Sequence, residues 1–340
     1  MSYEKNYISI LNVLACIGVV ILHTFETGYT SDANFVFEVL IRAIAYCAVP
    51  VFFMITGATL IDYRERYDTK TFFKKRLLKV IIPLIIWSII YFIINFFKGK
   101  FSINDLSFKF VFEYFFLVKT NPIFWFFVVI IGIYLAIPVI SLIPQESRRK
   151  AFLYIIIITF VFNQFLPDLL YHLNLNYNYD LKFPLTYSGW ISFIFIGYYI
   201  DKYEIVKKHR VIIYVLGIIG FLTMVVPTIF ISYHKNESCS WFDEYYDAPC
   251  ILYSASVFLF FKSKINNNQI VTKIMPFFNF VAPTTLGIYV LHIAIRDFLR
   301  YFYTYSYFGM NLVLTLSILT ICFIVVKIVQ KIPGLKHIFP

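Results

Sequence analysis

Apolar residues in this chain come in long runs separated by short polar segments. The runs cover residues 7–25, 35–62, 80–97, 122–144, 151–167, 185–200, 211–233, 248–262, 284–303 and 310–330. Each is near or above the minimum of about 17 residues that a helix needs to cross the hydrocarbon core, with the sixth and eighth the shortest. The pattern predicts an all-α integral membrane protein. We expect a bundle of about ten transmembrane helices that forms one domain over residues 1–340.

The positions of the basic residues predict the orientation of this bundle. Most of the 30 Lys and Arg residues fall in alternate connecting segments, such as 64–79, 148–150 and 202–210. Cytoplasmic loops of membrane proteins carry an excess of Lys and Arg. We therefore expect both termini in the cytoplasm, and a multi-pass protein of the cell membrane.

The composition agrees with this class and excludes others. Hydrophobic residues make up 60% of the chain and charged residues only 14%, whereas soluble domains carry about 25% charged residues. The net charge of +11 therefore indicates membrane topology and not nucleic-acid binding. The sequence shows neither a glycine-rich phosphate loop nor a zinc spacing, so we expect no metal. The first run is too long for the core of a cleaved signal peptide and is expected to stay as a helix.

Three segments outside the long runs carry expectations of their own. Residues 108–121 are apolar but too short to span, which favours an outer interfacial or re-entrant helix. The aromatic-rich segment 169–183 is expected either to cap an external opening or to lie in an interfacial aromatic belt. Cys239 and Cys250 flank a predicted outer loop, and the sequence leaves open whether they form a disulfide.

The first apolar run carries a polar stripe. Asn12 and His23 are eleven positions apart, which is about three full helical turns, so both lie on one face, and Cys16 falls on the same stripe. Lipid cannot satisfy such side chains, so this face is expected to meet protein, a cavity or a substrate path. Imidazole can act as a general base or as a nucleophile, which makes His23 the first candidate for chemistry, with a structural role as the alternative.

A second candidate site lies at the expected cytoplasmic end of the third run. Arg76 and Lys79 are three residues apart and share a helix face, and Lys75 is adjacent. Paired basic residues at this position suit a phosphorylated ligand that arrives from the cytoplasm. They would serve equally well as topology anchors that contact lipid headgroups.

A third candidate site lies in the ninth run. His292, Arg296 and Arg300 repeat every four residues and share a face, with Asp297 beside them. A charged stripe in a span indicates either a lined cavity or a buried ion-pair network.

The second run has two further features. Glu38 and Arg42 have the i, i+4 spacing of a pair, most simply a structural one. Pro50 frees a backbone carbonyl, and Gly57 allows another helix to approach closely.

Taken in order along the chain, these blocks resemble the membrane acyltransferase type 3 family. They are VVILH at the end of the first run, VPVFFMITGATL, FFKKRLLKVIIPLIIW, FWFFVVIIGIYLAIPVI, SFIFIGYYI and TTLGIYVLH. The resemblance covers residues 5 to 330 and rests on the order and spacing of the blocks together. Members of the family include bacterial O-acetyltransferases of surface polysaccharides, lipid-linked sugars and peptidoglycan.

The resemblance implies a ten-helix bundle that takes an acyl group from cytoplasmic acyl-coenzyme A and transfers it to a sugar hydroxyl on the outer side. His23 matches the family histidine, and Asn12 stands where the family has an arginine. Lys5, two turns earlier on the same face, could supply the missing charge. Arg76 and Lys79 correspond to the family's paired arginines, which are thought to contact coenzyme A.

We therefore expect an O-acyltransferase, most simply an O-acetyltransferase, of the bacterial plasma membrane. Acetyl-coenzyme A would be the donor, a surface or lipid-linked glycan the acceptor, and membrane lipid a further partner. His292, Arg296 and Asp297 would line the acceptor side, and a homo-oligomer is left open. One alternative is a transporter or flippase for a lipid-linked sugar, with His23 and Arg296 along its path. Another is a membrane scaffold that needs no His23.

Overall fold

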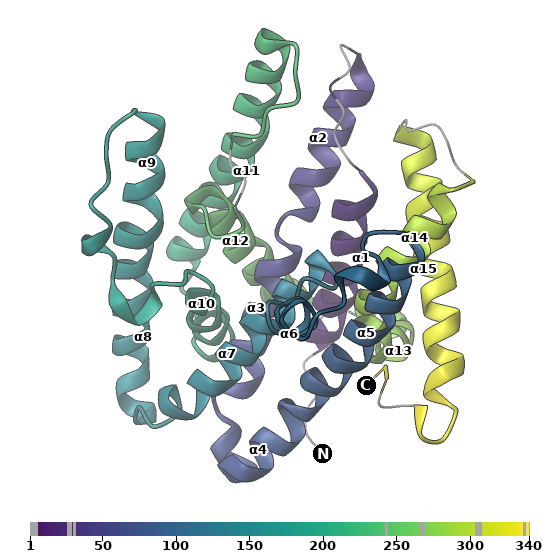
Figure 1. Cartoon of the computed structure of the whole chain (residues 1–340). Helices are drawn as coiled ribbons and strands as arrows, with labels where there is room; N and C mark the ends of the chain where they lie inside the picture. Colours follow the sequence, from purple (N-terminus) through teal and green to yellow (C-terminus); the bar gives the residue numbers. More distant parts are fainter. Residues whose placement is uncertain are drawn as a thin grey trace. The chain divides into compact units, whose positions relative to one another are not determined.

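The computed structural model describes residues 6–25, 29, 32–241, 244–265, 269–302, 308–335 and 338–339. These residues are helical or irregular, and none of them forms a strand. The chain divides into two compact units, residues 1–61 with 143–323 and residues 62–142 with 324–340. Figure 1 shows the helices in order along the chain.

The first unit contains the helix that carries His23 and most of the others. Its helices are α1 (Asn6–Thr24), α2 (Ala33–Ala45), α3 (Ala48–Leu60), α8 (Gln145–Thr159), α9 (Leu166–His172), α10 (Ile191–Lys202), α11 (Lys207–Lys235), α12 (Ala248–Ile265), α13 (Gln269–Val281) and α14 (Thr285–Arg300). Helix α1 packs against α2, α3, α12, α13 and α14. The polar face of α1 is therefore turned toward protein.

The second unit contains the basic candidate site. Its helices are α4 (Thr69–Arg76), α5 (Leu78–Phe97), α6 (Phe108–Phe116) and α7 (Trp125–Ile140), and α15 (Phe308–Gln330) begins in the first unit and ends in the second. Asp68 begins α4 by accepting a hydrogen bond from the Thr71 amide at 2.8 Å. Hydrogen bonding to the Thr71 side chain, and then to its amide, lowers the pKa of the Asp68 carboxyl.

Nine helical segments among the described residues are long and apolar enough to cross a membrane. Of the ten expected spans, the run 185–200 is the one that does not form a helix long enough to cross the membrane. Its helix, α10, has 12 residues and extends only about 18 Å. Its side chains are largely buried, and it packs between α3, α8 and α12. A short helix surrounded by other helices does not need to match the bilayer thickness.

Two glycines bring α3 and α10 into direct backbone contact. A Cβ atom on Gly57 would lie 2.0 Å from the Ile194 carbonyl oxygen, and one on Gly197 would lie 2.0 Å from the Met54 carbonyl oxygen. The contact is therefore reciprocal, and the prediction of a close approach at Gly57 is confirmed. Small residues at such a crossing let two apolar helices pack without intervening side chains.

A π-helix at Phe160–Phe165 joins α8 to α9. It turns Asn163 inward, where its amide nitrogen donates to the Phe183 and Thr186 carbonyls at 3.1 Å and its oxygen accepts from the Phe183 amide at 2.6 Å. The C-terminal end of the segment 169–183 is thus attached, through Phe183, to Asn163 of the π-helix. Insertions of this kind are common near functional sites.

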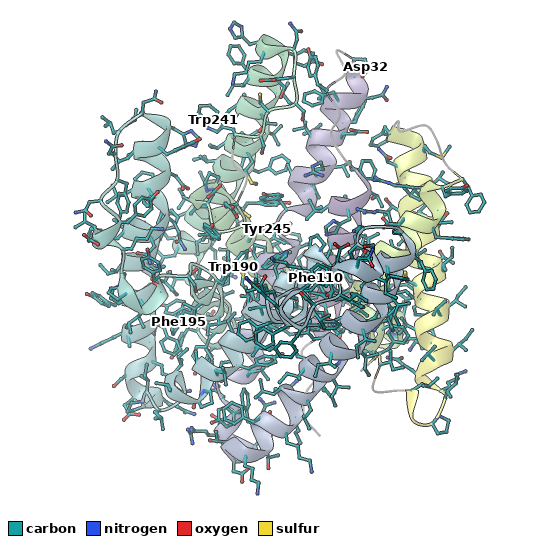
Figure 2. All side chains as sticks on the ribbon, in the orientation of Figure 1. Asp32, Phe110, Trp190, Phe195, Trp241 and Tyr245 are labelled. Carbon is teal, nitrogen blue, oxygen red and sulfur yellow. The ribbon has the colours of Figure 1, made fainter. Side chains whose placement is uncertain are left out.

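Aromatic side chains fill the region between α3, α10 and the segment before α12. The ring centroids of Trp190 and Tyr245 are 6.1 Å apart, and Tyr46 stacks on Tyr245 at 4.7 Å; Figure 2 shows Trp190 and Tyr245 close together. Cys239 and Cys250 are not joined in the structure.

Helix α6 is the short helix expected in residues 108–121. Ser107 caps it by accepting from the Phe110 amide at 3.1 Å, and Lys109 and Glu113 form an exposed ion pair at 3.9 Å. Tyr114 attaches α6 to α5, because its hydroxyl accepts from the Asn95 amide at 3.0 Å.

Candidate active site at the end of the first helix

The polar stripe of α1 faces the segment that runs from the end of α13 into α14. The Asn12 amide donates to the Ala282 carbonyl at 3.5 Å, and its oxygen accepts from the Thr285 hydroxyl at 3.4 Å. The Cys16 thiol points to the Thr285 carbonyl at 3.7 Å. The predicted common face is confirmed, and its partner is α14. Asn12 lies about 16 Å along the helix from His23, so its contacts join helices and lie away from that imidazole.

His23 lies beside a second histidine on α14. The ring centroids of His23 and His292 are 5.1 Å apart and the rings are tilted by 43°. His23 is half-buried, whereas His292 is completely buried. The spacing within each helix suggested both residues, but not that they meet.

The tautomer of His292 follows from its hydrogen bond. Its Nδ1 lies 2.6 Å from the Tyr289 carbonyl oxygen, which can only accept, so Nδ1 carries the proton. Nε2 is then a bare acceptor, and it is buried without a hydrogen-bond partner. A buried acceptor of this kind is costly unless something donates to it. The site therefore holds an unsatisfied lone pair next to the His23 ring.

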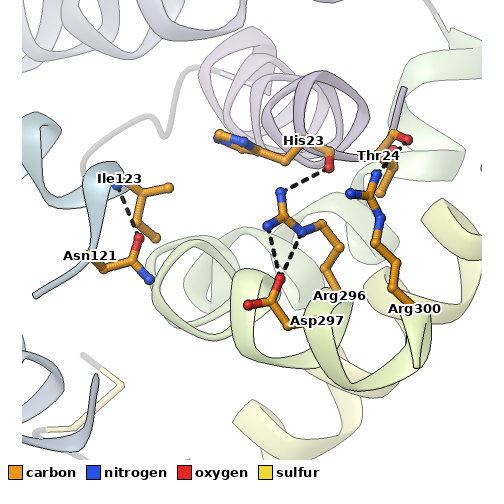
Figure 3. Close-up of polar contacts among 7 residues, drawn as sticks. All are labelled: His23, Thr24, Asn121, Ile123, Arg296, Asp297 and Arg300. Atoms are coloured by element: carbon orange, nitrogen blue, oxygen red, sulfur yellow. Dashed lines mark hydrogen bonds and ion pairs between the residues drawn. The ribbon is translucent and has the colours of Figure 1, made fainter. Parts of the chain in front are cut away.

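Three arginines hold the carbonyl end of α1 at His23. Arg42 of α2 donates to the carbonyls of Leu22, at 3.1 Å, and of Phe25. Arg296 donates to the His23 carbonyl at 3.2 Å, and Arg300 donates to the Thr24 carbonyl at 3.3 Å. Figure 3 shows the two contacts from α14.

These arginine contacts explain why α1 can end where it does. The last four carbonyls of a helix have no partner within it, and hydrocarbon offers none. Positive charge is also favourable at a helix C-terminus. The arginines therefore fix the backbone that carries the His23 ring.

Asp297 completes the arrangement by pairing with Arg296. Its carboxylate accepts from the Arg296 guanidinium at 2.8 and 3.1 Å, and the two side chains are 32% and 18% exposed. The partial exposure shows an ion pair that is only half-enclosed. The stripe on α14 therefore forms a partly exposed network that contacts α1.

Glu38 and Arg42 interact electrostatically, as their spacing suggested, but their hydrogen bonds go to other groups. Buried Glu38 accepts from the Asn311 amide at 2.9 Å, while Arg42 donates to carbonyls at the end of α1. The i, i+4 spacing therefore predicts that the two charges are close but not which groups they bind. The contact of Arg42 with the end of α1 was not predicted, although an arginine within a span must find a partner there.

The basic residues of the second unit form a cluster of their own. The Lys75 ammonium lies over the Tyr67 ring, 4.6 Å from its centroid. Arg76 is half-buried, and both its Nε and the Tyr67 hydroxyl are buried without a hydrogen-bond partner. Lys79 is exposed. Unpaired donors on a cationic and an aromatic side chain fit an anionic ligand such as a phosphate group.

The structure thus sorts the predicted residues into two groups. His23, His292, Arg296 and Asp297 lie together in the first unit, and Lys75 with Arg76 in the second. Lys5 lies outside the described residues. Among the described residues, no group of His, Cys, Asp and Glu could hold a metal ion.

The described residues are helical or irregular, and nine of their helical segments are long and apolar enough to cross a membrane, which indicates a multi-pass membrane protein. The comparison with protein families agrees: residues 5–329 match the acyltransferase domain, type 3. The chain belongs to the acyltransferase type 3 family, and it is a membrane acyltransferase. Searches of curated proteins and of solved structures found no match.

The arginine contacts to α1 predict that Arg296 acts through His23. We expect Arg296→Gln to lower kcat about ten- to hundredfold, because it releases the backbone that orients the ring, and to leave the KM of the acyl donor unchanged. The measurement is steady-state acyl transfer by the purified protein.

The control for this prediction is Arg300→Gln, one turn further along the same face, which contacts Thr24 and should have the smaller effect. In a His23→Ala background, Arg296→Gln should cause no further loss. Additive losses would mean that Arg296 works independently of His23.

Proposed function

We propose that the protein is an O-acetyltransferase that uses acetyl-coenzyme A and acetylates a sugar hydroxyl of a surface or lipid-linked glycan in the bacterial plasma membrane. The observation that carries the proposal is the pair of histidines at the end of α1. One ring is half-buried and can be reached by a substrate, while the other is buried and presents an acceptor nitrogen beside it.

In the proposed reaction, His23 removes the proton from the acceptor hydroxyl as that oxygen attacks the thioester carbonyl. The carbon–sulfur bond breaks, and coenzyme A leaves as the thiol, with the proton returned by the imidazole. Alternatively, His23 first takes the acetyl group and then passes it to the hydroxyl. The bare Nε2 of His292 favours either route, because it can receive a hydrogen bond from His23 when that ring is protonated.

The other residues have supporting roles in this proposal. Arg296 and Asp297 hold the backbone of His23 and neutralise each other next to the acceptor. His292 is too deeply buried to touch a substrate and acts through His23. Lys75, Arg76 and Lys79 bind the phosphates of coenzyme A, for which the unpaired Nε of Arg76 is the supporting observation. Asn12 joins α1 to α14 where the family has an arginine.

The test uses the purified protein in nanodiscs with radiolabelled acetyl-coenzyme A and a glycan extract. We expect coenzyme A release and label on the glycan with the wild type only, not with His23→Ala. Label that stays on the wild-type protein without acceptor would favour the acyl-histidine route. If the wild type neither binds nor turns over any acyl-coenzyme A with a range of acceptors, the proposal is wrong and a transporter becomes the better explanation.

The donor site gives a separate prediction. Arg76→Gln should raise the KM for acetyl-coenzyme A about tenfold or more, because a hydrogen bond between charged groups contributes about 1.5–3 kcal/mol. The measurement is donor saturation kinetics together with calorimetric titration of coenzyme A. Lys74→Gln is the matched control, since Lys74 is an exposed residue of the same helix. If both variants raised the KM equally, Arg76 would contribute only as part of the general positive charge of the surface.

A further inference from the structure

A large cavity lies in the first unit, away from His23. It is bounded by α8, α10, α11 and α12 and has a volume of about 760 Å³, within the roughly 300–1,000 Å³ of pockets that hold small molecules. In Figure 1 these four helices lie together on the left of the view. The acyl-transfer site and the coenzyme A cluster contribute no residue to its lining.

The cavity is apolar along its wall and basic at one end. Leu153 of α8 and Ile213 and Leu216 of α11 belong to the apolar part. At the other end lie Arg149 and Lys150, which are both exposed. Such a lining suits a ligand with an aliphatic chain, which would contact the apolar wall, and an anionic head, which would contact the basic end.

The basic end has further features that suit an anion. Arg149 and Lys150 lie early in α8, and His209 lies in the first turn of α11. Val206, which precedes α11, belongs to the lining and provides no side-chain cap, so the positive end of α11 adjoins this end of the cavity. Glu204 is the one acidic residue of the lining. The Arg149 guanidinium is held over the Tyr203 ring at 5.6 Å from its centroid, which keeps its charge at the rim.

The geometry points to a binding site for an anionic phospholipid, with its phosphate at Arg149 and Lys150 and one acyl chain along Leu153, Ile213 and Leu216. The basic segments 148–150 and 202–210 put this end of the bundle on the cytoplasmic side by the charge rule, where anionic lipid headgroups accumulate. The site is independent of the proposed acetyl transfer.

The test compares lipids retained by the full-length protein after extraction from nanodiscs of phosphatidylglycerol and phosphatidylcholine in equal parts, measured by native mass spectrometry. Both lipids have the same chains and a phosphate, but only phosphatidylglycerol has net charge. We expect the wild type to retain phosphatidylglycerol preferentially, and the double variant Arg149→Gln, Lys150→Gln to lower this preference about 25-fold, since each basic residue near a membrane surface contributes about a factor of five.

Two matched controls locate the effect. Lys207→Gln with Lys208→Gln removes the same charge at the start of α11 from residues outside the lining, and should lower the preference far less than the double variant of α8. Leu216→Trp should exclude the acyl chain and lower retention of both lipids, whereas Ile212→Trp, on the exposed side of α11, should not. If the charge variant does not fold, the comparison of Leu216→Trp with Ile212→Trp still tests the proposal.

Three outcomes would overturn the proposal. The first is equal retention of the two lipids by the wild type. The second is that the charge variant and Leu216→Trp both retain the two lipids in the same amounts as the wild type. The third is displacement of the lipid by glycerol 3-phosphate at concentrations that leave bulk bilayers intact, which would indicate a site for a soluble phosphate and not for a lipid.

Discussion

His23→Ala is expected to lower the rate of acetyl transfer about 10²–10⁴-fold, the usual contribution of a positioned general base. The reason is local: the ring is half-buried, lies 5.1 Å from that of His292 and is carried by a backbone that Arg296 holds. The neighbouring His292 is completely buried, so a substrate cannot reach its ring directly. The rate is measured as coenzyme A release and as label on the acceptor.

The control for this loss is His234→Ala, which removes an exposed histidine at the end of α11 and should leave the rate unchanged. His23→Gln adds a variant of closer size that keeps hydrogen bonding but cannot accept the proton. Binding of coenzyme A should survive in both His23 variants. If His23→Ala transferred the acyl group at the rate of the wild type, His23 would have no part in the mechanism.

The second large effect concerns folding: Gly57→Ala should destabilise the protein by about 3 kcal/mol or more. The added methyl group would lie 2.0 Å from the Ile194 backbone, which no side-chain movement can relieve, so α3 and α10 must separate. We expect Gly197→Ala to behave in the same way. For a unit of this size the apparent Tm in detergent should fall by roughly 6–12 °C.

Gly132→Ala is the matched substitution, because a Cβ on Gly132 of α7 would meet no atom within 4 Å. Alanine favours a helix over glycine by about 1 kcal/mol, so this variant should be as stable as the wild type or more so. A similar loss of stability in Gly57→Ala and Gly132→Ala would show that the effect does not depend on the contact between α3 and α10.

The helical period predicted which face of α1 is polar. Eleven positions between Asn12 and His23 put both on one face, and the structure turns that face toward α14. The period says nothing of the partner helix, so the meeting of His23 with His292 could not be predicted, because it depends on packing between segments about 270 residues apart.

Two other features had no signal in the local pattern. Glu38 and Arg42 have the spacing of a pair and interact electrostatically, but their hydrogen bonds go to Asn311 and to the carbonyl end of α1. The π-helix at Phe160–Phe165 lies within an ordinary apolar run. Both follow from hydrogen-bonding groups that must be satisfied away from water, and these are set by the tertiary arrangement.

The arginine contacts at the end of α1 also bear on how the protein is made. Helix α1 is synthesised first, yet two of the three arginines that satisfy its last carbonyls come from α14. A nascent chain that stops before Arg296 lacks both contacts from α14 to the carbonyls of His23 and Thr24. The end of the first helix to be synthesised is therefore completed only after most of the chain has been made.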